Sequence, residues 1–133
     1  AVLPLIKSDF LQLLLASAGD GIGNYNLEIN DSYACCVVMA SFGYPDEYEK
    51  EKEISGIENN NKHENSIVFH SGTKFSGEGK VISSGGRVLS VVGISEVSMK
   101  EAVKNSYERV SGIEFGNKYF RKDIGERQLT VDS

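Results

Sequence analysis

The stretch KVISSGGRVLSVVG, residues 80–93, decides the fold that the sequence predicts. Two short apolar runs flank a Ser-Ser-Gly-Gly step, and an arginine follows that step at once. Short apolar runs separated by a glycine-rich step are typical of paired β-strands. We therefore expect strands at Lys80–Ser83 and Arg87–Val92 that pair with each other as a hairpin.

The charges beside these glycines allow two interpretations. A turn of two or four residues would place Lys80 and Arg87 on one face of the hairpin, because side chains alternate along a strand. Arginine could then bind a phosphate through two hydrogen bonds and lysine as a point charge, while Gly85 and Gly86, which lack Cβ atoms, would let the ligand approach the backbone. The other interpretation is a plain turn with two solvated charges, and the pattern alone favours it.

The rest of the chain predicts helices on either side of further strands. A first helix should begin at Ser8 or Asp9, and a second should begin at the capping box formed by Ser98 and Glu101. The other expected features are a helix stop at 19–23, a strand buried on both faces at 34–40, a solvated charge run at 46–53, a flexible stretch at 54–64, a strand at 66–70, a hairpin turn at 71–79 and a short strand near Tyr119. This order predicts an α+β fold, a small and mostly antiparallel sheet with flanking helices.

Composition and charge exclude several classes of protein. The net charge of −5 argues against a general nucleic-acid binder. No run of 18 apolar residues occurs, so no membrane span is expected. The two cysteines, Cys35 and Cys36, are neighbours that cannot easily bridge each other within a strand, and we expect a reduced, cytoplasmic protein.

Motifs for catalysis or metal binding are missing from the sequence. The two histidines, His63 and His70, lack the spacing and acidic partners of a metal site, and a structural hydrogen bond is expected for His70. No glycine-rich loop leads from a strand into a helix, and no G-x-S-x-G elbow occurs. The residues alone therefore predict no nucleophile, no metal site and no site for ATP.

Five motifs in one order carry a resemblance that extends over nearly the whole chain. They are ASFGYP (40–45), YEKEKEISG (48–56), VFHSGT (68–73), SSGGRVLSVVG (83–93) and YFRKDIGERQL (119–129). Together they resemble the C-terminal region of phosphoribosylamine–glycine ligases, also called glycinamide ribonucleotide synthetases, which belong to the ATP-grasp group. Three positions depart from the family pattern: Phe42 and Glu51 stand where glycine is common, and Ser71 stands where alanine is common.

The resemblance implies a division of the chain and a fold for each part. Residues 2–16 are similar to the helix that closes the family's ATP-grasp domain, so residues 1–23 are expected to be the remnant of that domain. Residues 24–133 are expected to form the family's C-terminal domain, with a fold like the rudiment single hybrid motif.

The resemblance also implies an activity for the intact enzyme. The family joins glycine to 5-phosphoribosylamine with ATP and Mg²⁺ (or Mn²⁺), through an acyl phosphate of glycine, to give glycinamide ribonucleotide. The family's metal-binding Glu and Asn would precede residue 1. This chain alone is therefore expected to be inactive and to bind no cofactor, and its expected partners are the enzyme's own ATP-grasp core and the small-molecule substrates.

Site residues follow from the resemblance by position. In related ATP-grasp enzymes the matching hairpin holds the ribose 5-phosphate, which implies that role for Arg87 and, as a weaker match, for Lys80. Arg121 and Asp123 would either line the same pocket or form a structural ion pair. Two alternatives stay open for the chain as a whole: a purely structural or interaction module, and the C-terminal domain of another ATP-grasp ligase or carboxylase.

Overall fold

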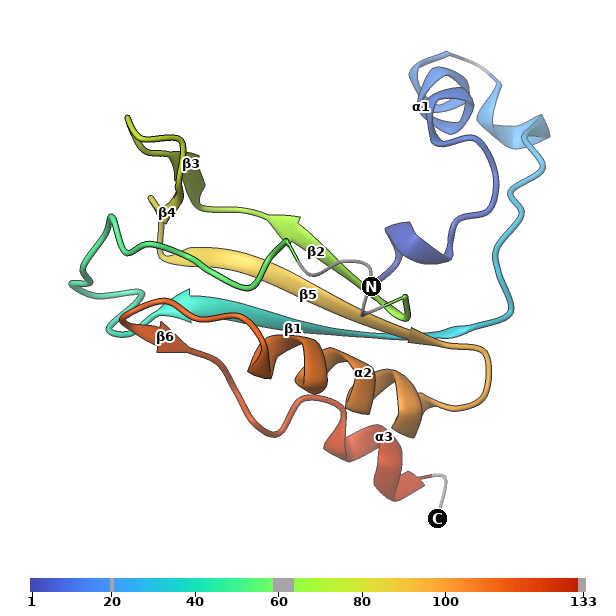
Figure 1. The fold of residues 1–133 in the computed structure, drawn as a ribbon. Coiled ribbons are helices and arrows are strands. Elements are labelled where there is room, and N and C mark those ends of the chain that lie inside the picture. Colours follow the sequence, from blue (N-terminus) through green and yellow to red (C-terminus); the bar gives the residue numbers. More distant parts are fainter. Residues whose placement is uncertain (20, 59–63, 132–133) are drawn as a thin grey trace.

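A four-stranded antiparallel sheet carries the fold, with strand order β2-β5-β1-β6 (Figure 1). The structure is a computed structural model, and it describes residues 1–19, 21–58 and 64–131. The α-helices and strands are α1 (Phe10–Ala18), β1 (Tyr33–Ser41), β2 (Ser66–His70), β3 (Thr73–Phe75), β4 (Val81–Ser83), β5 (Arg87–Ser95), α2 (Met99–Ser111), β6 (Lys118–Tyr119) and α3 (Glu126–Val131), with 3-10 turns η1 (Leu3–Leu5) and η2 (Ile22–Asn24). The predicted α+β class is confirmed.

Both helix starts follow the sequence prediction. The Asp9 carboxylate accepts a hydrogen bond from Gln12 N at 2.9 Å, and the Ser98 hydroxyl accepts one from Glu101 N at 3.2 Å. Each cap satisfies a backbone donor that the first turn of a helix leaves free. The Glu101 carboxylate accepts from the Ser95 hydroxyl, which ties the start of α2 to the end of β5.

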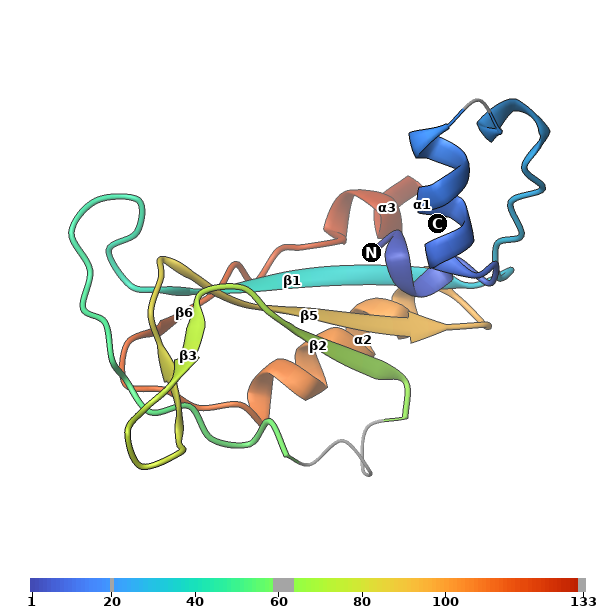
Figure 2. The ribbon, with the colours of Figure 1, turned by 90° about the horizontal axis from the view of Figure 1, so that it is seen from above.

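Only one face of the sheet is covered by a helix along its length. On β1, Cys35, Val37 and Met39 are buried, whereas Val38, which points to the other face, is 39% exposed. Helix α2 covers the buried face, and η1 and α1 lie over one end of the opposite face (Figures 1 and 2). The prediction that 34–40 is buried on both faces is therefore wrong, because a continuous apolar run does not reveal how much of the second face is covered. We call that second face the open face.

Helix α2 approaches the sheet most closely at Gly93. A Cβ built on Gly93 would lie 2.3 Å from Ala102 O and 2.3 Å from Ser106 N. The buried Ser106 hydroxyl accepts a hydrogen bond from Gly93 N at 2.9 Å and lies 2.7 Å from Cys35 O, to which it can donate. One hydroxyl of α2 thus links the backbones of β5 and β1.

The predicted hairpin between Lys80–Ser83 and Arg87–Val92 is wrong. Both strands exist, but β4 pairs with β3 in a separate two-stranded sheet, while β5 pairs with β2 and β1. The turn lies at the far end, where Ser76 N donates to Lys80 O at 2.8 Å, so the predicted turn at 71–79 contains β3. The β2–β3 connection and the β4–β5 connection both pass from one sheet to the other at a corner where Gly72 and Gly85 cross. A Cβ on Gly72 would lie 2.8 Å from Gly85 Cα. Such an approach requires glycine at position 72, and it leaves only a tight space, 3.2 Å from Gly72 Cα, for a Cβ at position 85.

The second half of the charge run at 46–53 is not a solvated loop. Glu51 N donates to Ser83 O at 2.7 Å, and Ser83 N donates to Lys52 O at 2.9 Å, so this segment lies antiparallel to β4. The Glu51 carboxylate pairs with Lys74 at 2.7 Å, although the Glu51 backbone has a φ of 60°. Of the expected flexible stretch at 54–64, residues 59–63 lie outside the described residues. The expectation is wrong for its start, because Ile54 is buried and Ile54 N donates to Val81 O at 2.9 Å.

We expect Gly93→Ala to destabilise the chain by roughly 1–3 kcal/mol, because the added Cβ overlaps the backbone of α2 and the helix must move. Urea unfolding followed by circular dichroism measures the loss. Gly77→Ala is the matched control, since nothing lies within 4 Å of a Cβ built there. An equal loss in both variants would contradict the close approach at Gly93.

The left-handed backbone at Glu51 generates a second prediction. Glu51→Gly should be more stable than Glu51→Ala by about 0.5–1 kcal/mol, because glycine relieves the left-handed strain by more than it loses in chain entropy. Both variants lack the carboxylate that pairs with Lys74, so the comparison isolates the backbone term. The measurement is the difference in free energy of unfolding between the two variants, and equal values would show that φ is not positive in solution.

Candidate functional site

A hollow of about 500 Å³ lies on the open face beside the corner between the two sheets. Four segments bound it: β1, the loop after β1, the connection between β2 and β3, and the start of β5 with the residue before it. We call it the Arg87 hollow, and its lining residues are Val38, Tyr44, Ser71, Gly72, Gly86, Arg87 and Ser90. Figure 2 shows that the loop after β1 and both corner segments gather at the same end of the sheet.

A bulge directs Arg87 toward the hollow. Met39 pairs with Leu89 and Ala40 pairs with Arg87, which leaves Val88 as an extra residue on β5. Val88 and Leu89 are both fully buried, while Arg87 is exposed. A bulge of this kind re-aims the side chains beside it, and here it turns the arginine away from the core.

The Arg87 guanidinium has no carboxylate within 4.0 Å among the described residues. Some other cations do have one, namely Lys7, Lys52, Lys74, Lys80, Lys104, Lys118 and Arg121. Among the described residues Lys50, Lys100 and Lys122 also have none, so the lack of a partner alone does not distinguish Arg87. The lining of the Arg87 hollow also includes no acidic residue, in a chain whose net charge is −5. A cation without a counter-ion, in a hollow free of carboxylates, suits an anionic ligand.

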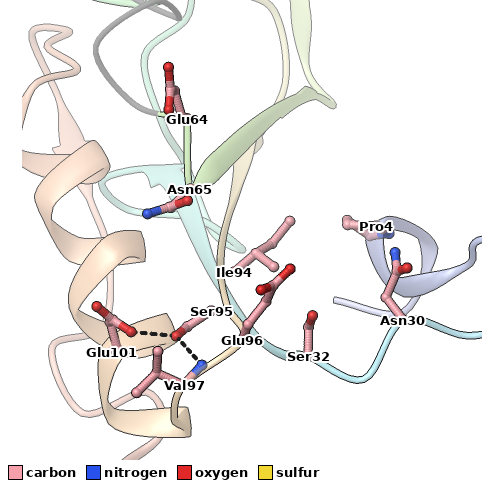
Figure 3. Close-up of a pocket in the computed structure, with 10 residues that line it drawn as sticks. All are labelled: Pro4, Asn30, Ser32, Glu64, Asn65, Ile94, Ser95, Glu96, Val97 and Glu101. Carbon is pink, nitrogen blue, oxygen red and sulfur yellow. Dashed lines mark hydrogen bonds between the residues drawn. The ribbon is translucent and has the colours of Figure 1, made fainter.

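Three other hollows have acidic linings. The one in Figure 3 lies between the N-terminal segment, which contributes Pro4 and Asn30, and the end of β5. Its lining includes Glu64, Glu96 and Glu101, and the other two include Glu47 with Glu49 and Glu53 with Glu114. Repulsion between carboxylates and an anion disfavours each of them as an anion site.

The structure changes the role expected for Gly85 and Gly86. Both lie beside Arg87, but their open sides are filled by the protein itself. A Cβ on Gly86 would lie 1.9 Å from a ring carbon of Tyr44, and a Cβ on Gly85 would lie 3.2 Å from Gly72 Cα. The prediction that these glycines let a ligand approach the backbone is therefore wrong on these sides: they let the Tyr44 ring and Gly72 approach instead.

Lys80 does not join Arg87. Its ammonium pairs with the Glu53 carboxylate at 2.9 Å, and Lys80 is not part of the lining of the Arg87 hollow. The expectation that both cations share one face failed because β4 and β5 belong to different sheets.

Arg121 and Asp123 form an ion pair with each other. Arg121 Nε donates to Asp123 Oδ1 at 2.9 Å, and a second contact joins Arg121 Nη2 to Asp123 Oδ2. The hydrogen bond from Arg121 lowers the pKa of the Asp123 carboxyl and raises the pKa of the arginine. The Tyr107 hydroxyl donates to Arg121 O at 2.9 Å and accepts from Ile124 N at 3.0 Å, which holds this segment against α2. Of the two roles expected for the pair, this geometry favours the structural one.

Two residues that matter structurally gave no signal in the sequence. Nothing in the local sequence around Tyr44 indicates that Gly86 lies beneath its ring. Arg109 is fully buried within α2, where its guanidinium donates to Gly56 O at 2.8 Å and Ile57 O at 2.7 Å, and burial lowers its pKa. The structural hydrogen bond expected for His70 is confirmed: its Nδ1 lies 2.9 Å from Thr73 Oγ1.

The part of the chain that the structure describes offers neither a metal cluster nor a helix that could span a membrane. In 1–19, 21–58 and 64–131, no group of three or more His, Cys, Asp or Glu side chains could hold a metal ion. Within the same ranges, none of the helices combines the length and the apolar character needed to cross a bilayer.

Comparison with known proteins places this geometry in context. The family model described as phosphoribosylglycinamide synthetase, C domain, matches residues 34–127. A phosphoribosylamine–glycine ligase of Fusobacterium nucleatum is 45% identical over 98% of this chain and 30% of that protein. A bifunctional purine biosynthetic protein of Dictyostelium discoideum is 38% identical over 96% of this chain and 16% of that protein.

A solved structure shows a similar fold. The crystal structure of phosphoribosylamine–glycine ligase from Thermotoga maritima has a TM-score of 0.68 and 32% sequence identity, over 86% of this chain and 27% of that chain. The chain thus spans less than a third of the length of each of these three proteins.

The ion pair of Arg121 generates a pH prediction. Because the pKa of Asp123 is lowered in the folded state, its contribution to stability is present above the ordinary value of 3.8 and is lost as the pH falls through the lowered one. Arg121→Gln should move the pKa of Asp123 up toward 3.8 and should cost stability at pH 7 but not in strong acid. A carboxyl-detected NMR titration measures the pKa.

Lys122→Gln is the control for this titration, because it removes a neighbouring charge without breaking the contact with Arg121. The control should leave the pKa of Asp123 below 3.8. An Asp123 pKa at its ordinary value in the unmodified chain would mean that the pair is not formed in solution, and the pocket role would then be favoured.

Proposed function

This chain belongs to the family of phosphoribosylglycinamide synthetase C domains, and from that premise we propose that it is the C-terminal part of a ligase that joins glycine to 5-phosphoribosylamine. In the proposed reaction ATP phosphorylates the glycine carboxylate, and the amine of phosphoribosylamine then displaces the phosphate to form the amide. ATP and Mg²⁺ would be held by a separate ATP-grasp core. The proposed role of this domain is to bind the ribose 5-phosphate and to pack on that core.

One observation carries the proposed binding role: the Arg87 guanidinium lies in a hollow without carboxylates and has no acidic partner among the described residues. A planar guanidinium can donate two parallel hydrogen bonds to a phosphate. Holding a phosphate that takes no part in the chemistry positions the reacting amine and so lowers the entropic part of the barrier. Gly85 and Gly86 support this site indirectly, because they allow the corner from which Arg87 projects.

The proposed packing on the core rests on a different surface. On α1, Leu11, Leu14 and Leu15 are 63%, 51% and 58% exposed, and α1 has no buried residues. An apolar helix face of this kind is typical of a contact surface. We therefore propose that residues 1–23 belong to the ATP-grasp domain and that residues 24–133 form the C-terminal domain.

In the intact ligase, Arg87→Ala should raise the KM for phosphoribosylamine and leave the KM for ATP nearly unchanged. Loss of one charge-assisted contact costs about 1.5–3 kcal/mol, which corresponds to roughly 10- to 150-fold in KM. Steady-state kinetics with each substrate varied in turn measures this, and Arg87→Lys should recover part of the loss because lysine keeps the charge without the bidentate geometry.

Lys80→Ala is the matched control for this experiment, since the Lys80 ammonium pairs with Glu53 outside the Arg87 hollow. It should change neither KM. An equal rise in both KM values for Arg87→Ala would count against the phosphate role, and no change in either would leave the domain as a purely structural module.

A further inference from the structure

A second side chain with a polar group, that of Tyr44, lines the Arg87 hollow. It belongs to the loop that follows β1, and it lines the hollow together with Arg87. Tyr44 is 40% exposed, and its hydroxyl makes no hydrogen bond with the described residues. Tyr44 therefore offers a free donor next to a free guanidinium.

The position of the Tyr44 ring is set by backbone contacts. Ser41 N donates to Gly86 O at 2.8 Å, and Tyr44 N donates to Ser41 O at 3.1 Å, so the base of the loop is tied to the corner that carries Arg87. The ring lies against Gly86, where a Cβ would be 1.9 Å from it. On its other side it packs edge-on against Tyr48, with 5.8 Å between the ring centroids. A donor held in place by such contacts loses little entropy when it binds a ligand.

The chemistry of a phosphate monoester leaves room for this donor. Its phosphorus carries three terminal oxygens, of which a guanidinium can engage two in bidentate fashion. The third oxygen needs a neutral donor, because a second cation is absent from the lining of the hollow. A tyrosine hydroxyl is such a donor, and its ring offers an apolar wall to a sugar.

We infer that Tyr44 is a binding residue for the sugar phosphate: its hydroxyl donates to the phosphate oxygen that Arg87 leaves free, and its ring bounds the pentose. Gly86 then acts through Tyr44, because any side chain at position 86 would displace the ring from the hollow. This inference rests on the proposed function, since it takes the same ligand in the same hollow.

The test uses the intact ligase and two variants that disturb Tyr44 in different ways. Tyr44→Phe removes the hydroxyl and keeps the ring, whereas Gly86→Ala keeps the hydroxyl and displaces the ring. Each should raise the KM for phosphoribosylamine by about tenfold, the usual effect of losing a hydrogen bond to a charged group. The kcat and the KM values for ATP and glycine should stay within about twofold, a split that a merely structural role would not produce.

Ribose 5-phosphate is a stable probe of the same contact. It should inhibit competitively with phosphoribosylamine, and Tyr44→Phe should weaken that inhibition by about tenfold. Tyr48→Phe is the matched control, because Tyr48 packs on Tyr44 but lines another hollow. It should leave both values unchanged.

The outcomes separate the inference from the function on which it rests. If Arg87→Ala raises the KM for phosphoribosylamine but Tyr44→Phe and Gly86→Ala do not, Tyr44 is no ligand contact and the inference is overturned while the proposed function stands. If Arg87→Ala leaves that KM unchanged, the proposed function fails and the inference fails with it. Melting temperatures of all variants identify any that lose activity by unfolding.

Discussion

Helix α2 can lie against the sheet only because residue 93 has no side chain. The helix backbone occupies the space of the missing Cβ, and the Ser106 hydroxyl links Gly93 N of β5 to Cys35 O of β1. Cys35, Val37 and Met39 of β1 and Val91 of β5 belong to one core cluster with Ala102 and Val110 of this helix. Because α2 can cover only one face, the opposite face stays open, and that is where Arg87 lies.

A second backbone contact decides what the open face can bind. Gly72 and Gly85 cross at a distance that excludes a side chain at position 72, and both segments pass from one sheet to the other at that point. The bulge at Val88 follows directly, so Arg87 projects from the junction instead of from a regular strand. Packing, and not the hairpin geometry expected for these glycines, thus positions the guanidinium.

The distribution of carboxylates gives similar side chains different roles. Lys74 and Lys80 pair with Glu51 and Glu53 beside the small sheet, and Arg121 pairs with Asp123 in the tail. These exposed pairs add little to stability, but they neutralise cations that could otherwise bind an anion. Lys50, Lys100 and Lys122 also pair with no carboxylate among the described residues, so what sets Arg87 apart is its place in a hollow whose lining includes no acidic residue.

Local information in the sequence determined the elements of this protein. Caps at Asp9 and Ser98 and the apolar runs of the strands depend on residues close together in the chain, so both helix starts and the main strands were predictable. The family was also predictable, because five short motifs in one order preserve its signature and the family model confirms it.

Tertiary structure decided which strands pair and which side chains meet. The contact of Gly72 with Gly85 and that of Tyr44 with Gly86 join segments that are distant in the sequence. The residues next to a glycine do not indicate whether that glycine forms a turn or makes space for an aromatic ring. The separation of Lys80 from Arg87 follows from those contacts. Strand propensity is local, whereas pairing is fixed by the steric fit of distant backbones, and only the folded chain contains that information.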